Sequence, residues 1–99
     1  MNALDRPELT EVPAFYHGYI ERVEGHDLLR ALRDASDRAH TVLNGIPAER
    51  GDHRYAPGKW SIKEVVQHVI DAERIFAYRA LRFARNDATE LAGFDEDMY

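Results

Sequence analysis

The stretch from Ser61 to Arg85 constrains the fold of this chain most strongly, because it predicts one long amphipathic helix. Ser61 and Glu64 have the S-x-x-E spacing of a capping box, in which the hydroxyl and the carboxylate each accept from a backbone amide of the first turn. At about 100° per residue, the apolar side chains that follow fall on one broad stripe. The stripe consists of Ile62, Val65, Val66, Val69, Ala72, Phe76, Ala80 and Phe83. A helix with such a stripe packs against other helices.

One histidine, His68, stands at the edge of this stripe and is the centre of the candidate site. Glu64 lies four residues before it and Asp71 three residues after it, so the three side chains share one side of the helix. Imidazole and carboxylate groups are ligands for divalent metal ions, but the same spacing also occurs on solvated helix surfaces. The spacing alone therefore leaves two interpretations of His68 open: a metal ligand supported by Glu64 or Asp71, and a structural surface histidine.

The hydrophobic pattern along the chain predicts a single all-α domain, since no segment alternates like a strand. The second helix is expected to start after Asp27, a good N-cap, and to stop at Asn44-Gly45 followed by Pro47. The expected segments are an irregular arm over residues 1–12, a short aromatic-rich helix over 13–24, a helix over 27–45, a loop over 46–60, the long helix over 61–85 and an irregular tail over 86–99.

Composition narrows the classes of function. The chain has no cysteine, so any metal site must use nitrogen and oxygen ligands. A net charge of −5 argues against a surface that binds nucleic acid through its phosphates. No apolar run approaches the length of about 18 residues that spans a bilayer, and the N-terminus has no secretory signal pattern, so we expect no membrane association and a cytoplasmic protein. Of the other histidines, His17, His40 and His53 lie in polar or irregular surroundings and are not expected to be ligands.

Two principal helices with broad apolar stripes do not close a core by themselves. A four-helix bundle needs four such stripes facing inward. We therefore expect a second copy of the chain to supply the missing pair and to form a homodimer.

The run from Tyr55 to Tyr99 closely resembles the first half of the DinB superfamily, the DNA-damage-inducible proteins. Three motifs carry the resemblance, in order: the KWS-I-K-E entry at 59–64, the H-x-x-D-x-E centre at 68–73 and the R-A-L-R-F-A-R-x-D exit at 79–87. The resemblance implies an up-down-down-up four-helix bundle. It also implies a metal-dependent enzyme of the kind that includes thiol S-transferases and thiol-dependent isomerases, with nickel or zinc held by three histidines.

His68 matches the first of these three ligands, on the second family helix, while the two histidines of the last family helix have no counterpart here. The resemblance thus implies a truncated DinB-like domain, a helical hairpin that makes half of a bundle and is completed by dimerisation. Three hypotheses follow: a self-associating structural module without catalysis, a metal site shared across a dimer with Glu64 or Asp71 beside His68, and a piece of a longer enzyme. Of these, we expect a dimeric half bundle in which the family's activity is impaired or absent, with an unknown small-molecule or thiol substrate.

Overall fold

Residues 5–99, the part of the chain that this computed structural model describes, form helices and connecting segments without any strand. This confirms the all-α fold class. Contacts divide the chain into two compact units, residues 1–46 and residues 47–99. The two long helices belong to different units.

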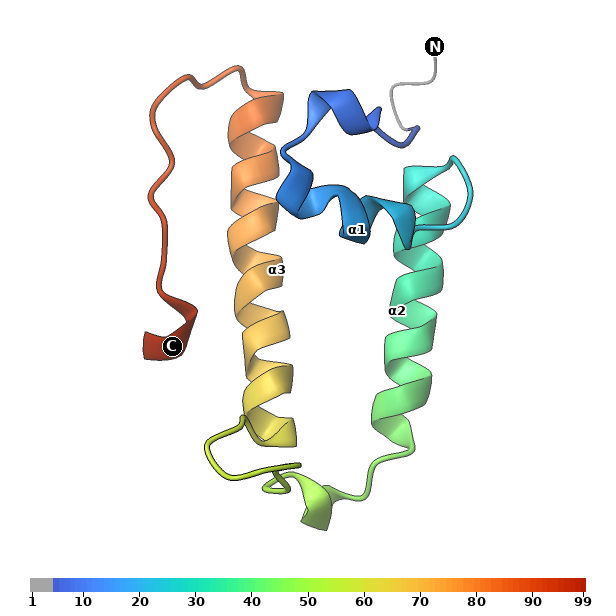
Figure 1. Cartoon of the computed structure of the whole chain (residues 1–99), viewed down its shortest axis with the longest axis vertical. Coiled ribbons are helices and arrows are strands. Elements are labelled where there is room, and N and C mark those ends of the chain that lie inside the picture. Colours follow the sequence, from blue (N-terminus) through green and yellow to red (C-terminus); the bar gives the residue numbers. More distant parts are fainter. Residues whose placement is uncertain (1–4) are drawn as a thin grey trace. The chain divides into compact units, whose positions relative to one another are not determined.

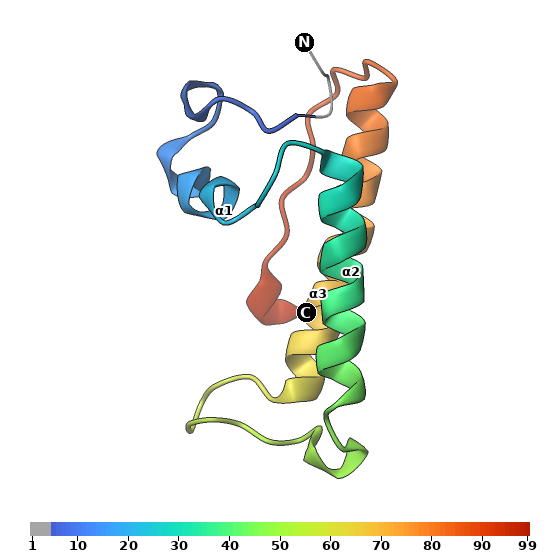
Figure 2. The ribbon, with the colours of Figure 1, turned by 90° about the vertical axis from the view of Figure 1, so that its right-hand side faces the viewer.

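The first unit contains two short 3₁₀ turns, Leu9–Glu11 and Ala14–Tyr16, and the helices α1 (His17–Glu21) and α2 (Leu28–Asn44) (Figure 1). α1 is shorter than the helix expected over residues 13–24, because the segment begins as a 3₁₀ turn after Pro13. Gly25, at φ +78°, then redirects the chain into α2. α1 consequently lies to one side of the first turns of α2 (Figure 2). The Asp27 side chain accepts from the Arg30 amide at 3.2 Å, which confirms the predicted N-cap.

The second unit contains a 3₁₀ turn at Ala48–Arg50, the helix α3 (Ile62–Ala84) and a last 3₁₀ turn at Glu96–Met98. The first amides of α3 have no partner within the helix, and other parts of this unit supply one for each. Ile62 donates to the His53 carbonyl at 3.1 Å, and Lys63 donates to the Gly51 carbonyl at 2.9 Å. Glu64 donates to the Ser61 hydroxyl at 3.2 Å. The loop before α3 is therefore fastened to the start of the helix.

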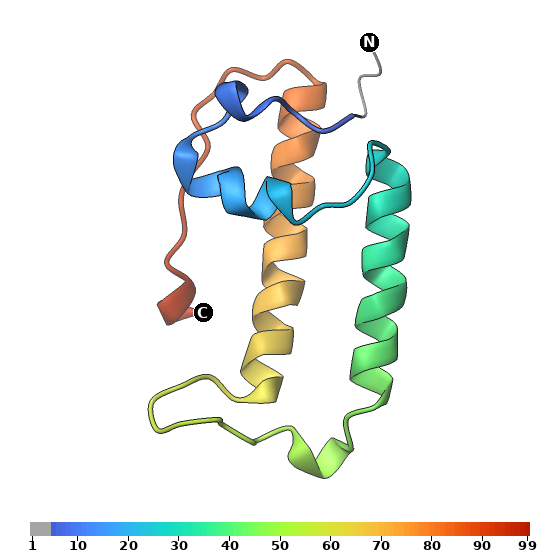
Figure 3. The same ribbon diagram turned by 45° about the vertical axis from the view of Figure 1, so that its right-hand side comes forward.

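The C-terminal end of α3 is a Schellman motif centred on Asn86. The Asn86 amide donates to the Phe83 carbonyl and the Asp87 amide to the Arg82 carbonyl, each at 3.0 Å. Asn86 has φ +53°, in the left-handed region that asparagine tolerates better than most residues. The chain turns back here, and residues 87–99 run alongside α3 toward its N-terminal half (Figures 1 and 3). We refer to residues 87–99 as the strap.

Burial separates two faces of α3. The side that includes His68, Asp71, Ile75, Arg79 and Arg82 is half-buried. The apolar stripe is partly open: Val65, Val69, Phe76 and Phe83 are between 47% and 76% exposed, whereas Ile62, Val66 and Ala72 are half-buried. Across residues 5–99, no apolar side chain is fully buried. None of the helices in this range combines the length and apolar character needed to cross a membrane.

Candidate functional site

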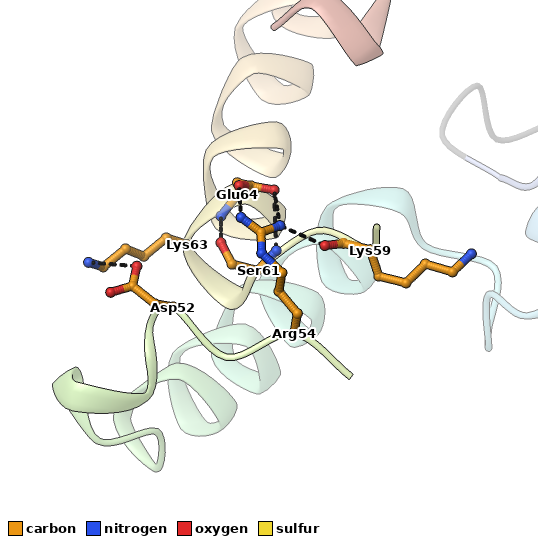
Figure 4. A network of polar contacts seen from close by, with 6 residues as sticks. All are labelled: Asp52, Arg54, Lys59, Ser61, Lys63 and Glu64. Atoms are coloured by element: carbon orange, nitrogen blue, oxygen red, sulfur yellow. Dashed lines mark hydrogen bonds and ion pairs between the residues drawn. The ribbon is translucent and has the colours of Figure 1, made fainter. Parts of the chain in front are cut away.

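The loop before α3 and the first turn of the helix are joined by a polar network (Figure 4). Arg54 donates to both carboxylate oxygens of Glu64, at 2.6 and 3.0 Å, and to the Lys59 carbonyl at 2.6 Å. The Glu64 carboxylate also accepts from the Ser61 amide at 3.2 Å, which completes the predicted capping box. The Arg54 guanidinium lowers the pKa of Glu64 and, with the Ser61 amide, outweighs the effect of desolvation. Glu64 is therefore an ionised group that is already engaged.

His68 lies one turn further along α3, beside a pocket of about 380 Å³. Its side chain is 30% exposed, and its ring packs at 5.0 Å between centroids against the ring of Trp60, the residue before Ser61. Its Nε2 atom faces Glu96, on the last 3₁₀ turn, with 3.7 Å between Nε2 and Oε2. The pocket is thus bounded by the start of α3 on one side and by the strap on the other. Its lining residues are Trp60, Glu64, Gln67, His68, Asp71, Glu96, Asp97, Met98 and Tyr99.

Two arginines of α3 hold the strap. Arg82 donates to the Thr89 carbonyl at 2.7 Å and forms an ion pair with Asp87 at 2.7 Å. One turn earlier, Arg79 donates to the Ala92 carbonyl at 3.0 Å, and its guanidinium lies 6.0 Å from the centre of the Phe94 ring. The strap residues that these arginines contact lie between the end of α3 and the 3₁₀ turn that carries Glu96.

Asp87 strengthens the contact between Arg82 and the strap. Its carboxylate accepts from the Thr89 amide at 3.0 Å, an Asx turn that directs the chain into the strap. The Thr89 amide and then the Arg82 guanidinium lower the pKa of Asp87, so this carboxylate is ionised over a wide pH range.

The three residues of the sequence-predicted site all border the same pocket, but they are not equally available. Both oxygens of Glu64 are taken by Arg54. One oxygen of Asp71 accepts from Gln67 at 3.0 Å. His68 Nε2 is the group that faces another segment, through Glu96.

A divalent ion suits this pocket in kind, because imidazole nitrogen and carboxylate oxygen are ligands for zinc and nickel. The number of donors is smaller than a catalytic site uses, since such sites take about three protein ligands. Within residues 5–99, no three His, Cys, Asp or Glu side chains are arranged to hold a metal ion together.

Four residues of this site are not found by the helical pattern: Trp60, Arg79, Arg82 and Glu96. Arginines near a helix C-terminus are also typical of a favourable interaction with the helix dipole, which hides their role as anchors. The only available signal for the strap is Asn86 directly after the helical pattern, because asparagine favours the left-handed conformation that ends a helix.

Comparison with known proteins finds one family whose model covers the residues of this site. The family model described as the DinB superfamily matches residues 31–99, more than two thirds of the chain. No curated protein and no solved structure matches the chain. The matched region contains all of α3, the loop before it and the strap, and so every residue of the His68 pocket. The chain belongs to the DinB superfamily.

Proposed function

We propose that this chain is a metal-binding protein in which His68 supplies one ligand to a zinc or nickel ion. The observation that supports this most directly is the position of His68 Nε2, which lies at a pocket and faces a carboxylate at 3.7 Å. Both carboxylate oxygens of the neighbouring Glu64 accept from Arg54, so the ring nitrogen of His68 is the more available of these two possible ligands. The family resemblance, in which the first metal ligand falls at this position, points the same way.

The activity proposed for the family is a metal-dependent, thiol-transferase-like reaction. A bound divalent ion there would supply a Lewis acid and an activated water or thiol. The chain's own part is to hold the ion through His68 and to shape the pocket with Trp60 and the strap. Because one histidine and nearby carboxylates are fewer ligands than such catalysis uses, we propose that this chain alone has little or no activity.

The extent of the family match supports treating the chain as a single DinB-like domain. The match begins within α2 and continues through the strap, so it crosses the boundary between the two units. We propose that both units belong to this one domain.

The test is the metal content of tag-free protein after dialysis against trace zinc and nickel. A site shared across a two-fold axis gives about half an equivalent per chain, whereas a site within each chain gives about one. In His68→Ala the bound metal should be lost. The matched control is His40→Ala, which removes an exposed histidine of α2 and should leave the metal content unchanged. Retention of the metal by His68→Ala would refute the proposal.

A second candidate function is that of a self-associating module without catalysis. It is favoured by the open apolar stripe of α3, in which Val69 is 58% and Phe76 is 60% exposed. Monomeric proteins rarely expose apolar patches of more than a few hundred Å², so a second copy that covers this face would form a homodimer.

Sedimentation velocity at low micromolar concentration tests the dimer. We expect the wild type to sediment as a dimer and Val69→Asp to sediment as a monomer, because a charge in the stripe must be desolvated on association. Arg74→Asp, which places the same side chain on an exposed position outside the stripe, is the control and should remain dimeric. A wild-type protein that is a cooperatively folded monomer would exclude this candidate.

A further inference from the structure

The apolar residues of α2 form a regular seam that is separate from the His68 pocket. From Leu28 onward they recur alternately after four and three residues, which is the seven-residue period of helices that pack side by side. Leu28, Leu32 and Val42 are between 48% and 63% exposed, so the seam is accessible to another helix. The seam consists of Leu28, Leu32, Ala35, Ala39, Val42 and, just after the end of the helix, Ile46.

The first half of the seam lines a groove of about 580 Å³. The lining includes the seam residues Leu28, Leu32 and Ala35. It also includes Asp34 and Arg38, which lie one turn apart beside the seam. The groove thus combines an apolar surface with one group of each charge, and a partner for it needs the same combination.

The seam has the same order of side-chain sizes in both directions from Asp37. Its two alanines lie two residues away on either side, and its larger aliphatic residues lie five and nine residues away. Two antiparallel copies of α2, with the two Asp37 residues at the same level, therefore place large side chains opposite large ones. The small side chains of Ala35 and Ala39 then face each other, so the helix axes can approach to about 8 Å. The facing pairs, each between one copy and the other, are Leu28 with Ile46, Leu32 with Val42, and Ala35 with Ala39.

The flanks of the seam favour this antiparallel orientation. In an antiparallel pair each flank meets the same flank of the other copy, whereas in a parallel pair it meets the opposite flank. One flank carries Leu29 and Leu43, and the other carries Asp34 and Arg38. Antiparallel pairing puts leucine beside leucine and Asp34 of each copy beside Arg38 of the other. Parallel pairing would place the Arg38 guanidinium against Leu43, at a cost in desolvation.

We propose that α2 is a docking surface for α2 of a second copy of this chain, in an antiparallel pair centred on Asp37. This inference rests on the second candidate function, because it takes self-association as given. It adds a second face to the one on α3, and it specifies an orientation and a register. The seam supplies the apolar burial, and the complementary charges of Asp34 and Arg38 fix the orientation.

Sedimentation velocity of the full, tag-free chain tests the seam. Leu32→Asp should raise the Kd of the dimer more than tenfold, because a carboxylate in the seam must be desolvated on association. His40→Asp makes the same change in charge at an exposed position of α2 outside the seam and should leave the dimer intact. Because Leu32 is itself exposed, the variant should fold, and circular dichroism verifies this.

Charge reversal tests the pairing of Asp34 with Arg38 between copies. Asp34→Arg makes the flank entirely positive, and Arg38→Asp makes it entirely negative. Each variant alone should dimerise about tenfold more weakly at low salt, since two ion pairs are lost that each contribute a factor of about three. An equal mixture of the two variants should form heterodimers with an affinity near that of the wild type. A mixture that associates no better than either variant alone would overturn the proposed register.

A disulfide reports the orientation directly, because the chain has no cysteine of its own. In the proposed pair Ala35 of one copy faces Ala39 of the other, whereas the two Ala35 residues lie four residues apart along the axis, or about 6 Å. Added to the separation of the helices, this exceeds the Cα distance of about 7 Å that a disulfide can bridge. Mild oxidation should therefore crosslink a mixture of Ala35→Cys and Ala39→Cys proteins more than either protein alone. Stronger crosslinking of each protein with itself would indicate a parallel pair and overturn the proposal.

The wild type and the α3 variant separate this inference from the function on which it rests. A wild type that stays monomeric at low micromolar concentration refutes self-association, and the α2 pair with it. If the dimer is lost in Val69→Asp but kept in Leu32→Asp, self-association stands and the α2 pair is overturned. Loss of the dimer in Leu32→Asp, with His40→Asp unaffected, supports the inference.

Discussion

Ser61→Ala should destabilise the protein through one well-defined contact. Ser61 is the most buried polar side chain among residues 5–99, with 3% exposed. Its hydroxyl accepts from the Glu64 amide at 3.2 Å, while the amides of Ile62 and Lys63 are satisfied by loop carbonyls. The substitution therefore removes the partner of a single amide and leaves the others intact.

The expected loss of stability in Ser61→Ala follows from the loss of this one hydrogen-bond partner. Loss of an N-cap serine costs about 1 kcal/mol, and the loss should not fall below this because the site is shielded from water. Glu64 stays attached to Arg54, so the second half of the capping box is expected to persist. For a domain of this size, about 1 kcal/mol lowers the Tm by about 4 to 8 °C.

Thermal unfolding followed by circular dichroism at a fixed protein concentration measures this shift, because association makes the Tm depend on concentration. Ser36→Ala is the matched control: Ser36 is exposed within α2 and caps no helix, and alanine is the better helix former there. Its Tm should stay the same or rise slightly. If Ser61→Ala and Ser36→Ala unfold at the same temperature as the wild type, the hydroxyl of Ser61 does not cap α3 and the reasoning is wrong.

Three further perturbations have expected outcomes. Because Arg54 lowers the pKa of Glu64, the stability from this ion pair is present above the ordinary carboxyl value of 4.5 and is lost as the pH falls through the lowered pKa of the folded state. Urea unfolding at decreasing pH should therefore show a steeper loss of stability in the wild type than in Glu64→Gln, and parallel curves would contradict this. Asn86→Val should lower the free energy of unfolding by about 1 to 2 kcal/mol because a β-branched residue disfavours positive φ, whereas Asn86→Gly should be tolerated; equal stability of the two variants in urea would count against the turn. Arg82→Met should raise the hydrogen exchange rate of strap amides, read by mass spectrometry, with α2 as the internal reference that must not change.

The sequence predicts those parts of the fold that local interactions determine. The capping box of Ser61 and Glu64 and the N-cap at Asp27 each join residues three apart, so the pattern alone is sufficient to find them. The way in which α2 ends does not follow from the sequence pattern. Gly45 follows α2 at φ −83°, not in the left-handed conformation that glycine permits. A 3₁₀-type bond from Gly45 to the Val42 carbonyl closes that end instead.

The candidate site was predictable only in part, because contacts between segments that are distant in the sequence place some of its residues. The helical period places His68, Glu64 and Asp71 on one side of α3, and all three border the pocket. The period does not reveal that Arg54, from the preceding loop, engages Glu64. Nor does it indicate Glu96, whose position depends on the turn at Asn86 and on bonds from arginine side chains to strap carbonyls. Such side-chain to backbone bonds place no constraint on the identity of the residue that accepts.

The residue at which α3 ends decides which side of the helix the returning chain meets. Each residue adds about 100° to the direction in which the chain leaves the helix, so a helix one residue longer would send residues 87–99 across a different face. Ending at Ala84 directs the strap over the His68 side and not over the apolar stripe, which lies roughly 100° further around the helix. The length of α3 thus determines which side of the helix the strap covers and which side the strap leaves free.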